Sequence, residues 1–267
     1  MPKVNIYSIV GLPMVDYCNQ WTKNAKIIIT DIERNQAGNI AKAAKIIKDS
    51  ISKEHATFLF GSGHSALPVQ EIYPRYGGIV GFIPMIELPL SFFTSIVGNM
   101  GFAQFDHLEN DASYGAAILK SYTIHPQDSL VVFTHSGSTP VTLEVAIRFK
   151  EMGGKVIGVT SRHRSANSLS KHPTGKSIID VADVLIDTGV PDSDVSIEID
   201  KLQLGPLSSI GAIAVANLLS IKSAEQLIHE KKNISVNPVR AFDPDSEQKM
   251  DEILAKYRKL YSRHIGL

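Results

Sequence analysis

The sequence predicts an α/β fold: a three-layer α/β/α sandwich around a five-stranded parallel sheet, with a helical extension at the N-terminus. Five short runs rich in Val, Ile or Phe show little apolar–polar alternation, which is typical of strands buried on both faces. The segments between these runs are long enough for the crossover helices that parallel strands require. With 267 residues, the chain can form one large domain or two small ones.

Each element is predicted by the pattern of its side chains. Residues 14–55 place apolar side chains at helical spacing with lysines between them, which predicts the helical extension. A helix is also expected to begin near Ala66, directly after the loop that ends the first strand. The five expected strands are 56–60, 79–83, 129–134, 155–160 and 183–187.

Residues 129–155 form the clearest strand–helix–strand unit. Thr139 can cap its helix, and Pro140 fits the first helical position, where its missing N–H costs nothing. Gly153 and Gly154 then end the helix. The apolar stripe of this helix consists of Val141, Val145, Phe149 and Met152.

Three segments are expected along the chain. Residues 1–55 form the helical segment, residues 56–235 the ligand-binding domain, and residues 236–267 a polar C-terminal arm. The arm is expected to contain a helix around residues 246–261, and its polarity suits packing on a neighbouring subunit.

Two uncharged stretches, 88–105 and 202–221, are about as long as a membrane span, ~20 residues. Polar side chains interrupt both, so neither is expected to cross a bilayer. The second is interpreted as a loop followed by a fully buried helix. Residues 1–15 lack the apolar core and the cleavage site of a signal peptide.

Composition and charge exclude several classes of protein. Lys and Arg total 27, as do Asp and Glu, so the formal net charge is zero. A neutral chain lacks the basic surface that binding to nucleic acid requires, and it has no strong attraction to an anionic membrane. The single cysteine, Cys18, can form no intramolecular disulfide. We therefore expect a cytoplasmic protein that binds neither nucleic acid nor membrane.

Two loops that end strands carry the chemistry, because ligands of parallel sheets bind beyond the C-terminal ends of the strands. Residues 61–66 (Gly-Ser-Gly-His-Ser-Ala) allow close approach of the backbone and lead into a helix whose free N–H groups attract an anion. Residues 134–139 (Thr-His-Ser-Gly-Ser-Thr) place four hydroxyls before a second helix. Either loop alone is compatible with an ordinary turn or cap, but the pair predicts a phosphosugar site. Its candidate residues are Gly61, Ser62, Gly63, Ser65, Thr134, His135, Ser136, Ser138 and Thr139.

The two loops resemble those of the SIS (sugar isomerase) domain family, which includes phosphoheptose isomerase, the isomerase half of glucosamine-6-phosphate synthase and small uncharacterised bacterial proteins. The resemblance covers about residues 35–262. It is carried by Ala43-Ala44, residues 60–65, 134–137 and 187–191, and Lys256-Tyr257.

The resemblance implies a flavodoxin-like sheet and a phosphorylated monosaccharide as the ligand, amino sugars included. It implies no organic cofactor, and a homodimer or higher homo-oligomer, since SIS pockets are commonly completed by a neighbouring subunit. Ser65, Ser136 and Thr139 would contact the phosphate, together with the backbone of His135. The turn before the last core helix adds two weaker candidates, Ser208 and Ser209.

The implied reaction is aldose–ketose isomerisation through an enediol, which needs a carboxylate or histidine near two carbons and a partner acid. Glu71, on the helix after the first loop, is the first candidate for the base, although it is equally compatible with a solvated helix position. His64 and His135 can shuttle a proton, or can simply bond to the backbone. His229 resembles in placement the helix-borne histidine of some isomerases. Glu198 is a further carboxylate, in an acidic stretch expected to be solvated.

No metal site is predicted. The nine histidines form neither a His-x-His nor a His-Glu-x-x-His pattern. Only His64 and His135 make a plausible spatial pair, and the sequence supplies no third ligand for them.

Two other functions remain open beside the isomerase. A non-catalytic phosphosugar sensor would use the same loops, but no attached DNA-binding segment is visible. A dinucleotide-dependent oxidoreductase would explain residues 61–66, which fit the G-x-G-x-x-A fingerprint. However, Ile83-Pro84 stands where that fold needs an acid, and the second loop would go unexplained. A serine hydrolase does not fit, because residues 134–138 lack the G-x-S-x-G pattern.

Overall fold

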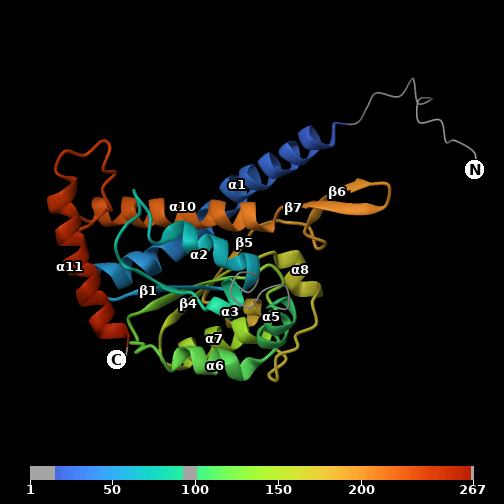
Figure 1. The fold of residues 1–267 in the computed structure, drawn as a ribbon, viewed down its shortest axis with the longest axis horizontal. Helices are drawn as coiled ribbons and strands as arrows, with labels where there is room; N and C mark the ends of the chain where they lie inside the picture. The colour runs from blue at the N-terminus through green and yellow to red at the C-terminus, as the bar shows by residue number, and fades with distance from the viewer. Residues whose placement is uncertain (1–15, 93–100, 266–267) are drawn as a thin grey trace, which may run out of the picture.

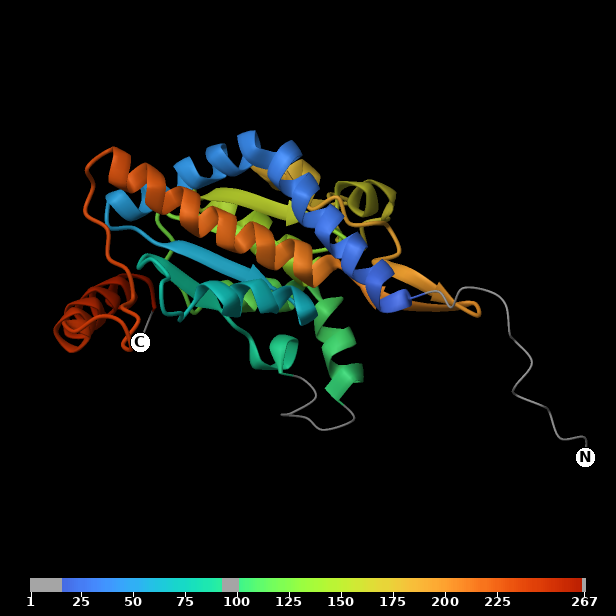
Figure 2. The ribbon, with the colours of Figure 1, turned by 90° about the horizontal axis from the view of Figure 1, so that it is seen from above.

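The computed structural model describes residues 16–92 and 101–265, and at its centre lies a five-stranded parallel sheet. Helices cover both faces of this sheet (Figure 1 and Figure 2), which confirms the predicted three-layer α/β/α sandwich. The order of strands across the sheet is β2-β1-β3-β4-β5. Their bounds are β1 (Thr57–Gly61), β2 (Phe82–Met85), β3 (Ser129–Phe133), β4 (Lys155–Thr160) and β5 (Val184–Asp187).

The strands lack polar alternation because both faces of the sheet are covered. All residues of β1 and β3 are buried. Phe58 and Phe60 enter the apolar core on one face, while Leu59 enters the core on the other. Four strands begin within one residue of the predicted positions. The second is displaced: Ile79 forms an isolated bridge with Val236, and β2 begins only at Phe82.

One face of the sheet is covered by α1 (Tyr17–Ser52), α2 (Leu67–Ile72) and α10 (Ser208–His229). Asp16 caps α1 by accepting the N–H of Asn19. The predicted helical extension is thus confirmed in α1, which packs its apolar stripe on α10 and the sheet. The helix expected near residue 66 starts as a 3₁₀ turn, η1 (Gly63–Ala66), and continues only briefly as α2.

The opposite face is covered mainly by α6 (Ala112–Leu119) and α7 (Pro140–Glu151), and the prediction for α7 agrees closely with these bounds. Pro140 is its first residue, and Gly153 follows its end. Thr139 occupies the N-cap position, but its hydroxyl makes no capping bond. The helices on this side are α3 (Leu88–Ser91), α5 (Gly101–Glu109), α6 (Ala112–Leu119), α7 (Pro140–Glu151), α8 (Arg162–Asn167) and α9 (Ile178–Val181).

The interpretation of residues 202–221 was wrong in two respects. Residues 202–206 form a strand, β7 (Leu202–Pro206), which pairs in antiparallel fashion with β6 (Val195–Ile199) outside the main sheet. The helix that follows, α10, is only partly buried, because Ile221 remains 64% exposed. Within residues 16–92 and 101–265, no helix is both long and apolar enough to span a bilayer. Residues 93–100 of the other uncharged stretch lie outside the described part.

The C-terminal arm carries α11 (Ser246–His264), slightly longer than the predicted helix. Its buried residues Tyr257 and Leu260 face the body of the same chain. The hydroxyl of Tyr261 donates to that of Tyr73 over 2.6 Å. The arm, expected to pack on a neighbouring subunit, therefore packs on its own chain in this structure.

The sheet has one topological switch point, between β1 and β3, from which successive strands are added in opposite directions. The register pairs Thr57 with Ser129 and Gly61 with Phe133. Both strands thus end at the same level, and the two loops singled out in the sequence begin side by side.

Candidate functional site

The first loop turns sharply because Gly61 has no side chain. A Cβ at Gly61 would lie 2.0 Å from the carbonyl oxygen of Ser65, far inside van der Waals contact. Gly63 has a φ of 62°, in the left-handed region that favours glycine. These two glycines fold the loop back on itself, so that Ser62 and Ser65 lie at the end of β1.

Replacing Gly61 by alanine is therefore expected to destabilise the fold by about 1–3 kcal/mol, because backbone atoms must move to admit the methyl group. Gly38→Ala is the matched control, since no atom of the described part of the chain lies within 4 Å of a Cβ there. In the middle of α1 it is expected to stabilise the protein by roughly 0.5–1 kcal/mol. Thermal and urea unfolding of both variants measure the two effects. A Gly61→Ala protein as stable as the wild type would contradict this account of the loop.

The second loop gathers hydroxyls at the start of α7. The Thr134 hydroxyl oxygen accepts the N–H of Gly137 over 3.1 Å, which closes the turn. Gly137 has a φ of 65°, and a Cβ there would meet Ser165 at 2.1 Å. The hydroxyls of Ser136 and Thr139 lie 3.2 Å apart. Two hydroxyls thus converge in front of the helix, and neither is used to cap it.

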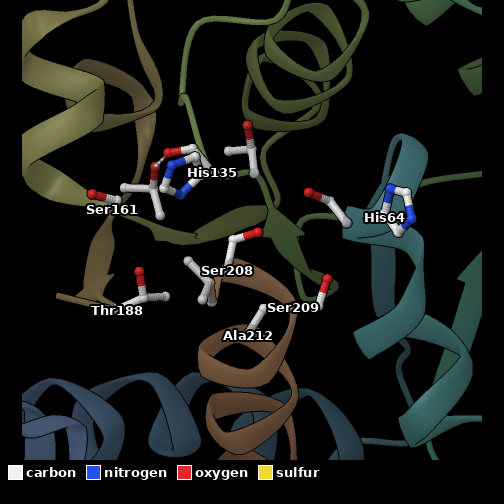
Figure 3. A pocket seen from close by; sticks show the side chains of 11 residues that line it. His64, His135, Ser161, Thr188, Ser208, Ser209 and Ala212 are labelled. Atoms are coloured by element: carbon white, nitrogen blue, oxygen red, sulfur yellow. Dashed lines mark hydrogen bonds between the residues drawn. The ribbon is translucent and has the colours of Figure 1, made fainter. Parts of the chain in front are cut away.

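A cavity with two lobes lies over these loops. The Thr139 lobe has a volume of about 240 Å³, near the lower end of small-molecule sites, roughly 300 Å³. The Ser208 lobe (Figure 3) is smaller and extends to the first turn of α10. Ser65, Thr134 and His135 line both lobes, so the lobes adjoin.

Most of the predicted site residues meet in this cavity. The Thr139 lobe contains Ser62, Ser65, Thr134, His135, Ser136 and Thr139. The Ser208 lobe contains His64, Ser65, Thr134, His135, Ser208 and Ser209. Gly61 and Gly63 shape the first loop without lining a lobe. Ser138 lines neither lobe, although it belongs to the second loop.

Three predicted candidates lie elsewhere. The Glu71 carboxylate accepts hydrogen bonds from Arg75 over 2.9 Å and from the Asn217 side chain over 3.2 Å, and it lines neither lobe. His229 is the last residue of α10, about 30 Å along the helix axis from Ser209 at 1.5 Å per residue. Glu198 is exposed on β6, where it bonds to Gln203. None of the three lines either lobe of this cavity.

Glu109 is a carboxyl group of the site that the sequence reasoning missed. It lies at the end of α5 and lines the Thr139 lobe. The Ser62 hydroxyl donates to its Oε1 over 3.0 Å. Burial raises the pKa of Glu109 above its ordinary value, and the Ser62 bond opposes the rise. No local spacing could have indicated it, because 47 residues separate the two partners.

Arg164, on α8, is the second residue that was missed. Neither of the two loops contains an Arg or a Lys. The fold nevertheless brings Arg164 to the wall of the Thr139 lobe. Its guanidinium donates to Asp192 over 3.2 Å and is partly exposed. The lobe therefore has one cation at its edge, which favours an anionic ligand.

His135 is the least satisfied polar side chain of the site. Both ring nitrogens are buried and make no hydrogen bond of ordinary geometry with the described residues, and the same holds for the Thr188 hydroxyl. All three atoms belong to residues that line the Ser208 lobe. Burial lowers the pKa of His135, although the Asp194 carboxylate and the nearby backbone carbonyl of Asp192 oppose this effect. A neutral imidazole offers one donor and one acceptor to a bound molecule.

Two helix N-termini face the cavity, and they differ in how they are capped. Asp194 accepts the N–H groups of Leu207 and Ser208 and the Ser208 hydroxyl, so the start of α10 already has an anion. No side chain within residues 16–92 and 101–265 caps the start of α7. The positive end of the α7 dipole is therefore available to a ligand in the Thr139 lobe.

The strand order and these loops define a protein with a phosphosugar isomerase-like α/β fold. Residues 20–161, more than half of the chain, match the SIS domain, and the chain belongs to this family. The predicted resemblance is confirmed. The dinucleotide alternative loses support as well, because the dinucleotide-binding fold has the strand order 3-2-1-4-5-6, in which β1 and β3 are not neighbours.

Comparison with individual proteins supports the assignment to this family. A UPF0309 protein of Listeria monocytogenes is 27% identical over 205 residues, which are 76% of this chain and 81% of that protein. A phosphoheptose isomerase from Francisella tularensis has a similar structure, with a TM-score of 0.51 at 14% identity over 80% of this chain and 100% of that one. The phosphoheptose isomerase of Neisseria gonorrhoeae gives a TM-score of 0.52 at 13% identity, over 78% of this chain and 97% of that one. At these identities the structures show the common fold alone.

Proposed function

We propose that this protein binds a phosphorylated monosaccharide and interconverts its aldose and ketose forms through an enediol. The observation that carries the proposal is the set of unpartnered groups in the cavity, the two ring nitrogens of His135 and the Thr188 hydroxyl. More than nine in ten buried polar groups in proteins have a hydrogen-bond partner. Exceptions grouped in one cavity therefore support a polar ligand that supplies the missing bonds.

The phosphate is assigned to the Thr139 lobe. Ser65, Ser136 and Thr139 offer hydroxyl donors there, the uncapped start of α7 offers backbone N–H groups, and Arg164 offers one positive charge. The start of α10, beside the Ser208 lobe, is a poorer choice, because its first N–H groups already donate to the Asp194 carboxylate. The Ser208 lobe is left for polar groups of the sugar.

The proton transfer is assigned to Glu109, in place of Glu71. An enediol forms when a base removes a proton from the carbon next to the carbonyl and returns it to the neighbouring carbon. Glu109 is the carboxyl group that lines the Thr139 lobe, and its raised pKa moves it toward the range in which a group both accepts and releases protons. His135, neutral because burial lowers its pKa, can move the proton between the two oxygens of the sugar, and His64 is a second candidate for this step.

Two further predictions remain proposals. The protein is expected to form a homodimer or larger homo-oligomer, and the exposed apolar side chains Ile27 of α1 and Ile221 of α10 would favour such contacts. The ligand-binding domain is expected to comprise residues 56–235, in a protein of the cytoplasm.

The test is a thermal-shift screen against sugar phosphates, with NAD and NADP included, followed by NMR in D₂O. A ligand raises the melting temperature by mass action, without any assay of turnover. An isomerase is then expected to exchange the hydrogen at the reacting carbon for deuterium and to form the second sugar. A shift without exchange would indicate the non-catalytic sensor. A shift with a dinucleotide alone would refute the proposal.

A further inference from the structure

A second group of side chains converges at the opposite end of the sheet, where β1 and β3 begin. His55 precedes β1, Asp128 precedes β3 and His264 ends α11. One ligand atom from each lies within 4.8 Å of the others. Asp128 Oδ1 is 3.2 Å from His55 Nδ1 and 3.0 Å from His264 Nε2. The side chains of Asp128 and His264 are 0% exposed, and that of His55 is 21% exposed.

The surroundings orient these three side chains. His264 Nδ1 lies 2.8 Å from the carbonyl oxygen of Leu260, which can only accept, so Nδ1 carries the hydrogen. The backbone N–H of Ala56 donates to Asp128 Oδ1 over 2.9 Å, and that of His125 donates to Oδ2 over 2.7 Å. Hydrogen bonds of this kind hold the ligands of metal sites in position.

The arrangement requires a positive charge between His264 and Asp128. With its hydrogen on Nδ1, the neutral ring presents a bare lone pair at Nε2. That lone pair faces a carboxylate oxygen 3.0 Å away, which also has only lone pairs to offer. Two such atoms repel each other unless a cation lies between them. The cation is either a second proton on the ring or a metal ion.

We propose that His55, Asp128 and His264 bind a zinc ion. Ligands at about 2.0–2.1 Å around a tetrahedral zinc are roughly 3.3 Å apart, close to the two distances observed. Imidazole nitrogen and carboxylate oxygen are both ordinary zinc ligands. A zinc ion would join all three atoms at once, whereas protons on His264 Nε2 and His55 Nδ1 would form two separate hydrogen bonds to Asp128 Oδ1.

The site has an open side. His55 lines a cavity of about 240 Å³ between the ends of α1, α10 and α11. Three protein ligands leave one position of a tetrahedral zinc free, and His55 is the ligand through which the site borders this cavity. The rim carries Lys232, Lys256, Lys259 and Arg263 against the carboxylate of Glu54, so the free position favours an anionic ligand such as hydroxide.

The test uses the full chain, stripped with a chelator and titrated with zinc chloride by calorimetry. One equivalent is expected to bind and to raise the melting temperature. Cobalt(II) in the same site is expected to give the visible absorption of a tetrahedral ion. Zinc uptake below one equivalent, or a cobalt spectrum of an octahedral aquo ion, would overturn the proposal in favour of a doubly protonated His264.

Variants locate the ion. His55→Ala is the primary variant, because this side chain is partly exposed and its loss leaves the buried pair intact; a loss of zinc affinity of at least tenfold is expected. Asp128→Asn tests the carboxylate, with circular dichroism to check folding. His163→Ala, exposed on α8, and His64→Ala, in the other cavity, are matched controls expected to bind zinc as the wild type does. Equal affinity in His55→Ala would place the zinc elsewhere and refute the site.

Discussion

Glu109→Gln is expected to slow isomerisation by a factor of roughly 10²–10⁴ while the sugar phosphate still binds, because the amide cannot remove a proton from carbon. Deuterium exchange at the reacting carbon, followed by NMR, measures the chemical step, and calorimetry measures binding. In the wild type, kcat/KM is expected to fall on the acid side as Glu109 becomes protonated. Since burial raises the pKa of this group, kcat/KM should begin to decline at a pH above the ordinary pKa range of a glutamate.

The same variant should be more stable than the wild type at neutral pH. The pKa of Glu109 is higher in the folded protein than in the unfolded chain, so its ionised form costs stability in the fold. Below the pKa of the unfolded chain, ordinarily 4.5, Glu109 is protonated in both states and costs the wild type no stability. As the pH rises through the pKa of the folded protein, Glu109 becomes ionised and the free energy of unfolding falls. Glutamine does not titrate. The gain in melting temperature should therefore be present at about pH 7 and absent at about pH 4.

Two matched variants complete this experiment. Glu198→Gln changes an exposed carboxylate on the β6–β7 hairpin and is expected to leave the rate of isomerisation unchanged. Glu71→Gln examines the first candidate from the sequence, whose carboxylate is bonded to Arg75 and Asn217. If Glu71→Gln stopped the reaction and Glu109→Gln did not, the base would be Glu71, reached by a substrate pose outside the cavity described.

The double variant Ser65→Ala with Ser136→Ala is expected to reduce affinity for the sugar phosphate by a factor of roughly 100 or more. Both hydroxyls line the Thr139 lobe. A hydrogen bond to a charged group contributes about 1.5–3 kcal/mol, and each 1.4 kcal/mol corresponds to a factor of ten in affinity. Inorganic phosphate should be affected as strongly as the sugar phosphate, because the loss concerns the phosphate group.

Ser138→Ala is the control from the same loop. Its side chain lines neither lobe, so affinity should stay within about a factor of two of the wild type. Calorimetry with both ligands gives the comparison, and thermal unfolding shows whether the variants keep the fold. Unchanged affinity in the double variant, or an equal loss in Ser138→Ala, would remove the phosphate from the Thr139 lobe.

Local patterns were sufficient for the parts of the fold that depend on nearby residues. Buried strands of a parallel sheet need apolar side chains on both faces, so β1, β3 and β4 could be located from composition alone. The start of α7 could be located because proline is tolerated in the first turn of a helix but not in its interior, and Pro140 therefore marks the beginning. The β6–β7 hairpin was missed, because its strands are half exposed and its acidic residues resemble a solvated loop.

The sequence by itself determined the fold class, the two hydroxyl-rich loops and the family resemblance, since each depends on residues within a few positions of one another. Only the tertiary structure decided which side chains share the cavity. It brought Glu109 and Arg164 in and left Glu71 and His229 outside. The histidine group shows the same limit, because Asp128 is 73 residues from His55 and 136 from His264. Contacts between residues so far apart in the sequence arise from the packing of whole helices on the sheet, so local sequence patterns cannot predict them.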